Sequence, residues 1–142
     1  MSEVIIAPDS ETILISYLDS AYSTYTDVGG TDLSSARAYG KVPNPRPSLF
    51  TRVIRTGGNR DRFIDQATLT VESWGPDEIT AQRLAALNQA LIFKVGQVSV
   101  SGTTYQTYRP QEFAGPARLP DPDSDQERYT QTVSVGFRAY AA

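Results

Sequence analysis

The side chains that could do chemistry in this chain are carboxylates, arginines, tyrosines and hydroxyls, because the sequence contains no histidine and no cysteine. Without histidine the chain lacks the commonest general base and the imidazole metal ligand. Without cysteine it has no thiolate nucleophile, thiolate metal site or disulfide. Acid–base catalysis would therefore need paired carboxylates. Asp61, Asp65 and Glu72 lie around one expected strand, but the period of two sends Asp65 and Glu72 to opposite faces, so we expect no enzyme activity.

A second group of carboxylates resembles the beginning of a calcium loop. Asp121, Asp123 and Asp125 occupy alternate positions. Such a loop also needs glycine at its sixth position and glutamate at its twelfth, where this chain has Gln126 and Thr132. The pattern fails where it is most demanding, so we expect a solvated or partner-facing acidic loop, with no metal and no cofactor.

Two features could bind nucleotides or nucleic acid, and each has a simpler interpretation. The glycines of residues 56–60 could cradle a phosphate, but this segment joins two expected strands and precedes no helix, so a hairpin turn is favoured. The eight tyrosines could stack on bases. Four of them lie on apolar faces, which favours packing: Tyr17, Tyr22, Tyr25 and Tyr129. A net charge of −3 also argues against general affinity for nucleic acid.

Arginines give the most distinctive pattern. No acidic residue lies between Leu33 and Arg60, whereas eleven of the 13 basic residues of the chain are arginine, the side chain that suits planar pairing with carboxylates. The acidic loop after Pro120 is the natural complement, either in the same subunit or in a neighbour. The sequence predicts a subunit or partner interface made of Arg46, Arg52, Arg55, Arg60, Arg118, Asp121, Asp123, Asp125 and Arg128.

These residues must be positioned by a sheet and two helices. Apolar spacing predicts helices over residues 8–25 and 76–94, the second followed by a left-handed Gly96. Strands are expected at 36–42, 49–56, 63–74, 98–100, 104–108 and 128–140, with turn residues at 57–61, Pro110 limiting its strand to an edge or an end, and a loop at 115–126.

The arrangement of these elements predicts one domain over residues 1–142. Its fold class is α+β, with an antiparallel-rich, mixed sheet of about five to six strands and both helices on one face. Trp74 is expected to plug the core under the second helix. No signal peptide and no membrane-spanning segment is expected.

Several motifs together resemble tail terminator (tail completion) proteins of long-tailed, siphovirus-type bacteriophages. The resemblance covers nearly the whole chain from about Pro8 to Tyr140, and it rests on residues 42–48, 52–58, 71–75, 115–124 and 128–133. It implies a virion protein, assembled in the host cytoplasm, that forms a hexameric ring on the head-proximal end of the tail tube. Such a ring ends tube polymerisation and offers the surface that joins the tail to the neck or connector of the DNA-filled head.

The resemblance also implies the partners: further copies of the chain, the tail tube protein and a neck protein, with DNA passing through the lumen without specific binding and no membrane. A ring repeats one contact between two different surfaces of each subunit. We therefore expect Arg46, Arg52 and Arg55 to face residues 120–123 of a neighbour, and sheet edges could also join across subunits. A neck or head-completion adaptor and a small non-catalytic binding module are the alternative functions.

Overall fold

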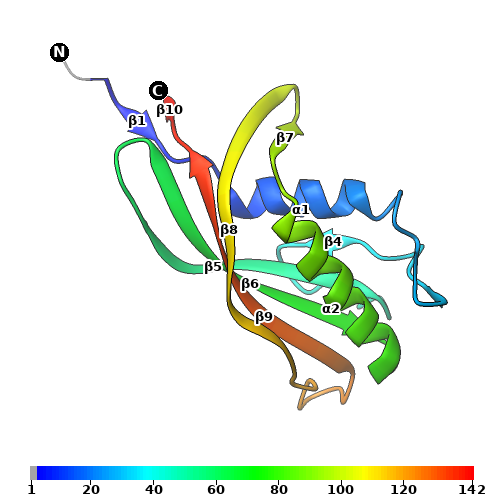
Figure 1. The fold of residues 1–142 in the computed structure, drawn as a ribbon. Helices are drawn as coiled ribbons and strands as arrows, with labels where there is room; N and C mark the ends of the chain where they lie inside the picture. The colour runs from blue at the N-terminus through cyan, green and yellow to red at the C-terminus, as the bar shows by residue number, and fades with distance from the viewer. Residues whose placement is uncertain (1–2) are drawn as a thin grey trace.

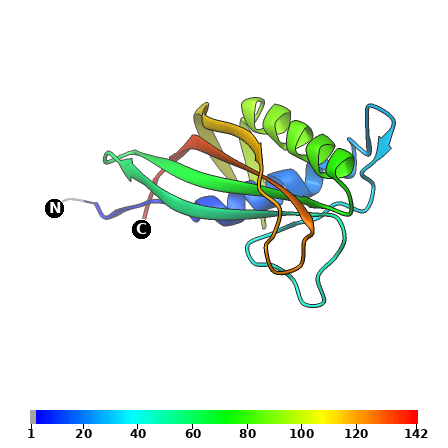
Figure 2. The same ribbon diagram turned by 90° about the horizontal axis from the view of Figure 1, so that it is seen from below.

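Two helices cover one face of a curled, six-stranded sheet in the computed structural model, which describes residues 3–142 (Figures 1 and 2). The elements are β1 (Ile5–Ile6), α1 (Ser10–Ala21), β2 (Asp27–Val28), β3 (Thr31–Asp32), β4 (Ala38–Tyr39), β5 (Phe50–Arg60), β6 (Ile64–Gly75), α2 (Glu78–Phe93), β7 (Gln97–Val100), β8 (Thr103–Arg118), β9 (Glu127–Arg138) and β10 (Tyr140–Ala141).

The main sheet has the order β4-β5-β6-β9-β8-β7. The neighbouring strands are antiparallel except for β4 and β5, which are parallel. Two small antiparallel pairs, β1 with β10 and β2 with β3, lie outside it. This mixed, mostly antiparallel sheet with its helices on one face confirms the predicted α+β class. No helix within residues 3–142 combines the length and the apolar character needed to span a membrane.

Alternation along the central strands explains where the core lies. Ala67, Leu69 and Val71 of β6 point toward the helices and are fully buried. The same face of β9 contributes Val133, Val135 and Phe137, and the helices complete this core with Ile13, Leu14, Leu18, Leu84, Leu87, Leu91 and Ile92. Within residues 3–142, no helix lies over the opposite face of the sheet.

Both helices begin two residues after their predicted starts, at Ser10 and Glu78. Asp9 and Asp77 are their N-caps, and each accepts a hydrogen bond from a backbone N–H three residues later. Helix α1 ends at Ala21, so Tyr25 lies beyond it and is 41% exposed, which corrects its expected place on the apolar face. Gly96 is not left-handed either, because α2 already ends through Lys94 in a right-handed conformation.

The strands differ from the prediction mainly in length. Strand β4 keeps only two residues of the expected 36–42. Strand β5 continues through Gly57 and Gly58, with a register shift after Arg55, so the hairpin turn lies just after Arg60 and not at 57–61. Strand β8 passes Pro110 and reaches Arg118 by three register shifts, so the loop begins at Leu119. Irregular pairing thus lets these strands continue through glycine and proline, which usually end strands in regular sheets.

Trp74 lies on the face opposite the one predicted. Its neighbour Ser73 faces α2, where Asn88 Nδ2 donates to Ser73 Oγ at 2.9 Å. The period of two then turns Trp74 away from the helices. There it stacks on Phe50, with 5.1 Å between ring centroids, and Tyr39 meets Phe50 edge-on. Trp74 is still only 3% exposed, so a second small cluster is buried under loops instead of a helix.

Candidate subunit interface

The predicted interface begins with Arg46, which meets the acidic loop within its own chain. Arg46 Nη1 lies 3.1 Å from Asp121 Oδ2, and its guanidinium lies over the Trp74 ring, 5.5 Å from the centroid. Ser124 also donates to Asp121 through its hydroxyl and its backbone N–H. The hydrogen bonds from Ser124 and Arg46 lower the pKa of Asp121. Of the two pairings that the sequence leaves open, the structure contains the intramolecular one.

Arg52 and Arg55 do not form one strip, because they are three positions apart on a strand and therefore lie on opposite faces. On the helix-free face Arg52 Nη1 lies 3.5 Å from Glu72 Oε1. On the helix side both terminal nitrogens of Arg55 donate to Asp65, whose side chain is 1% exposed. Within the chain, the structure therefore does not bring Arg52 or Arg55 to the acidic loop; that they face residues 120–123 of a neighbour stays a prediction.

Arg118 and Arg128 are also paired inside the chain. Arg118 donates two hydrogen bonds to Glu127, at 2.7 and 3.0 Å, which lower the pKa of that carboxyl. Arg128 Nε donates to the Leu119 carbonyl at 2.9 Å, and its guanidinium lies over Trp74, 5.2 Å from the centroid. These contacts hold the loop of residues 119–126 against the sheet.

The other predicted residues have no such partner. Within residues 3–142, Asp123 and Asp125 form no ion pair. Both lie in the same loop, where Asp125 has a φ of 57°. Arg60 meets no carboxylate in that part of the chain and donates instead to the backbone carbonyls of Ile5, Asp61 and Arg62.

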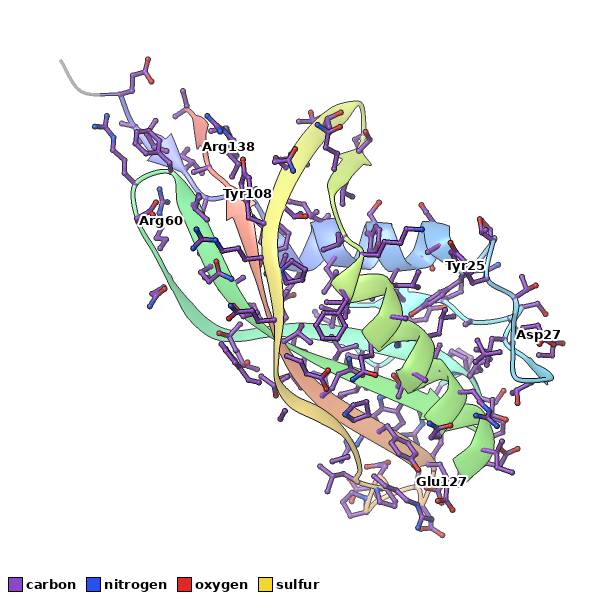
Figure 3. All side chains as sticks on the ribbon, viewed as in Figure 1. Tyr25, Asp27, Arg60, Tyr108, Glu127 and Arg138 are labelled. Atoms are coloured by element: carbon purple, nitrogen blue, oxygen red, sulfur yellow. The ribbon has the colours of Figure 1, made fainter. Side chains whose placement is uncertain are left out.

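Three further arginines were missed by the sequence analysis: Arg62, Arg109 and Arg138. Together with Arg60 they lie around the end of the sheet formed by the β5–β6 turn, the middle of β8 and the end of β9 (Figure 3). None of the four has a carboxylate within ion-pair distance among residues 3–142. One sequence feature could have indicated this group of arginines: each of them lies at the end of a strand, just after it, or at an irregular position within it.

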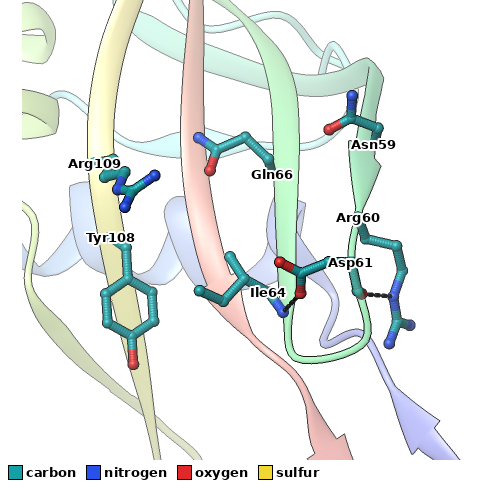
Figure 4. A pocket seen from close by; sticks show the side chains of 7 residues that line it. All are labelled: Asn59, Arg60, Asp61, Ile64, Gln66, Tyr108 and Arg109. Atoms are coloured by element: carbon teal, nitrogen blue, oxygen red, sulfur yellow. Dashed lines mark hydrogen bonds between the residues drawn. The ribbon is translucent and has the colours of Figure 1, made fainter.

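A groove of about 530 Å³ opens between the β5–β6 turn and β8 at this end (Figure 4). Gly136 of β9 leaves it deep, because a Cβ there would lie 3.0 Å from Gln66 Oε1 and 3.1 Å from the Tyr108 carbonyl oxygen. The register shift after Tyr108 and the φ of 49° at Arg109 place both side chains along the groove. Its other lining side chains are Asn59, Arg60, Asp61, Ile64 and Gln66.

The carboxylate in the groove, Asp61, is engaged by its own turn. It accepts hydrogen bonds from the backbone N–H groups of Phe63 and Ile64, each at 2.8 Å. These hydrogen bonds lower the pKa of Asp61. Asp61 therefore keeps its negative charge, and the groove carries the two guanidinium groups of Arg60 and Arg109 against this one carboxylate.

Exposed apolar side chains accompany the arginines. Phe63 is 56% exposed and lies under the Arg62 guanidinium, with 5.4 Å to the ring centroid. Val4, Ile6 and Tyr140 are exposed around the β1–β10 pair next to it. We call this surface the arginine end and define it by Val4, Ile6, Arg60, Arg62, Phe63, Arg109, Arg138 and Tyr140.

The opposite end of the molecule has the opposite charge. The start of α2 and the loop of residues 119–126 meet there, since Arg118 Nη2 lies 3.8 Å from Glu78 and also binds Glu127. We call this surface the acidic end and define it by Asp77, Glu78, Ile79, Leu119, Asp123 and Asp125. Its two large apolar side chains, Ile79 and Leu119, are exposed like the acidic ones. The two views of the ribbon place the β5–β6 turn and this loop at opposite ends (Figures 1 and 2).

The sheet edges are poorly suited to pairing with another chain. Strand β7 covers β8 only as far as Gln106, but Pro110 and Pro116 lack the N–H donor along the remaining edge, which is interrupted by register shifts. On the other side of the sheet, the backbone N–H of Arg55 already donates to the Glu11 carboxylate at 2.7 Å, so it is not available to another strand. Contacts between copies would thus depend on side chains at the ends of the molecule more than on its strand edges.

Comparison with protein families and with curated proteins identifies no relative of this chain. No family model matches the chain, and no curated protein is significantly similar to it. Among residues 3–142, no three acidic side chains are grouped so that they could hold a metal ion.

Proposed function

We propose that this chain is a non-catalytic structural subunit of a phage tail. In this proposal its copies assemble head to tail into a ring on the head-proximal end of the tail tube, stop the addition of tube subunits, and present the surface that joins the head. The sequence resemblance described above motivates the choice of tail terminator, and the charge distribution of the folded chain supports the ring.

The observation that carries the proposal is a cluster of unpaired arginines at one end and a pair of unpaired carboxylates in the loop at the other. Arg46, Arg52 and Arg55 are neutralised inside the fold by Asp121, Glu72 and Asp65. Among the charges without an ion-pair partner in residues 3–142, four arginines gather at the arginine end, whereas Asp123 and Asp125 lie in the loop at the opposite end. Two different and complementary surfaces on each subunit are what a head-to-tail contact requires, and repetition of that contact closes a ring.

The carboxylates also favour a structural role over catalysis. Asp9 and Asp77 cap helices, Asp61 closes a turn, and Asp65 pairs with Arg55. Each is thus held by a donor of its own chain. An acidic net charge of −3 further suits a ring through which DNA must pass without sticking.

Two measurements test the proposal. Native mass spectrometry of the purified chain should give a closed oligomer, and the chain should co-sediment with cognate tail tubes and block their further growth. Co-sedimentation with DNA-filled heads but not with tubes would identify a neck adaptor instead. A chain that stays monomeric alone and in the presence of tubes, and leaves tube growth unchanged, contradicts the proposal.

A further inference from the structure

The arginine end has a positive charge that the rest of the fold does not neutralise. Arg109 and Arg138 lie on the two sides of Tyr108, whose hydroxyl is 3.5 Å from Arg138 Nη1. Arg60 donates to three backbone carbonyls, which hold its guanidinium at the rim of the groove, and it forms no ion pair within residues 3–142. Bringing several unpaired guanidinium groups together is unfavourable unless a partner supplies negative charge.

The side chains around these arginines favour a protein partner over nucleic acid. Phe63 and Tyr140 are exposed between the arginines, and Val4 and Ile6 add aliphatic surface. Aromatic residues and arginine are the types enriched at the centres of protein–protein interfaces. A site that follows a phosphate backbone needs basic side chains but gains little from exposed Val and Ile.

The acidic end of the same molecule has the complementary composition. Asp123 and Asp125 have no ion-pair partner within residues 3–142, and Leu119 of the same loop is exposed, as is Ile79 at the start of α2. Pro120 and Pro122 restrict the loop, and the Arg46–Asp121 pair anchors its base. A restricted loop loses less conformational entropy when it binds.

We propose that the arginine end binds the acidic end of a second copy, with Asp123 and Asp125 of the loop entering the groove between the β5–β6 turn and β8. This inference rests on the proposed ring and names the contact that builds it. Arg60 and Arg109 flank the groove and can pair with the incoming carboxylates. The side-chain amides of Asn59 and Gln66 line the same groove and can donate to loop carbonyls.

The contact is tested with two charge variants that leave the internal ion pairs intact. Arg109→Asp/Arg138→Glu removes the positive charge of the arginine end, and Asp is chosen at position 109 because it tolerates the positive φ there. Asp123→Arg/Asp125→Asn replaces the two loop carboxylates with a basic and a neutral side chain, with Asn chosen for the positive φ at 125. Arg60 is left unchanged because it supports the backbone of the turn.

Sedimentation velocity over a concentration series at low and high salt measures self-association. Each variant alone should associate about tenfold or more weakly than the parent, and the parent should weaken at high salt. Mixing the two variants should restore assembly, because the acidic surface of one then meets the basic surface of the other. Lys41→Glu/Lys94→Glu is the control for Arg109→Asp/Arg138→Glu, with the same change in net charge on exposed lysines outside both ends, and it should assemble like the parent.

The outcomes separate this contact from the proposed function. Parent-like assembly of both variants, or failure of the mixture to assemble although each variant keeps the circular dichroism and melting temperature of the parent, overturns the contact; the ring can still stand. DNA binding by the parent that Arg109→Asp/Arg138→Glu removes without changing assembly assigns the arginine end to nucleic acid and also overturns it. If the variants behave as expected but the parent has no effect on tail tubes, the contact is supported and the proposed tail-terminator function is refuted.

Discussion

Arg55 and Asp65 join the two strands of the β5–β6 hairpin through a pair of parallel hydrogen bonds. Arg55 Nη2 lies 2.8 Å from Asp65 Oδ1, and Nη1 donates to Oδ2. They are not opposite each other in the ladder, since Arg55 opposes Leu69 and Asp65 opposes Arg60. The register shift after Arg55 lets its side chain reach along the hairpin. Glu11 accepts the Arg55 N–H, so the same residue ties the hairpin to the start of α1.

Breaking this pair should destabilise the fold strongly. Arg55→Met leaves the Asp65 carboxylate, which is 1% exposed, without its partner, and we expect a loss of about 3–5 kcal/mol in the free energy of unfolding. Arg55→Met/Asp65→Leu should lose less, because no buried charge remains. Urea denaturation measures both. Arg118→Ala is the control, since it removes an exposed pair worth about 1 kcal/mol or less; equal losses for Arg55→Met and Arg118→Ala would contradict the prediction.

A second prediction concerns the buried hydroxyl of Tyr22. This hydroxyl lies 2.7 Å from Thr51 Oγ1 and donates to Asn88 Oδ1. Tyr22→Phe leaves the Asn88 carbonyl without a donor in a dry core, so we expect a loss of about 1–3 kcal/mol in unfolding free energy. Tyr25→Phe, at a tyrosine that is 41% exposed, should change it by about 0.5 kcal/mol or less.

The same hydroxyl predicts a pH dependence. Burial raises the pKa of Tyr22 above its ordinary value. The unfolded chain then loses this proton near pH ~10 while the folded chain keeps it, so the contribution of Tyr22 is complete below pH ~10 and decreases as pH rises further. The stability difference between the parent and Tyr22→Phe should shrink from about pH 9 to about pH 11. A constant difference over this range would show that Tyr22 ionises equally in both states.

Trp74, the one tryptophan of the chain, reports on the acidic loop. Arg46 links its ring to Asp121. Asp121→Asn should release this arginine and shift the Trp74 emission, whereas Asp123→Asn should not, because Asp123 holds nothing in residues 3–142. In the parent the pKa of Asp121 is lower in the folded chain than in the unfolded chain. The contribution of Asp121 to stability is therefore present above pH ~3.8 and is lost as pH falls through the pKa of the folded chain. Emission that is independent of both substitutions would contradict this coupling.

The fold class could be predicted from sequence because the alternation of β6 and β9 and the caps Asp9 and Asp77 are local signals. Strand ends could not, since Gly57, Gly58 and Pro110 end strands in most contexts, whereas here register shifts carry the ladder past them. The orientation of Trp74 was available from the period of two. The expected position of Trp74 under α2 was inferred from its residue type and not from its place in the strand alternation.

The candidate interface was predictable only in part. Charge spacing indicates that arginines and acidic residues must pair, and Arg46 does meet the acidic loop. It cannot indicate which arginines remain unpaired, because Arg52 and Arg55 find Glu72 and Asp65 through the register of the β5–β6 hairpin. Arg109 and Arg138 come together through the pairing of β8 with β9, strands that a loop separates in sequence.

Gly75 sets how closely α2 approaches the end of β6, and its replacement gives the last prediction. A Cβ at this position would lie 2.7 Å from the Ala81 backbone N and 3.0 Å from its Cα, so only a shift of the helix could relieve the contact. Gly75→Ala should therefore lower the unfolding free energy by about 1–3 kcal/mol. Gly96→Ala is the matched control, because a Cβ there meets no atom within 4 Å and φ is not positive; it should leave stability unchanged or raise it by up to about 1 kcal/mol. Far-ultraviolet circular dichroism during urea unfolding measures both, and a Gly75→Ala variant as stable as Gly96→Ala would show that α2 moves freely on the sheet.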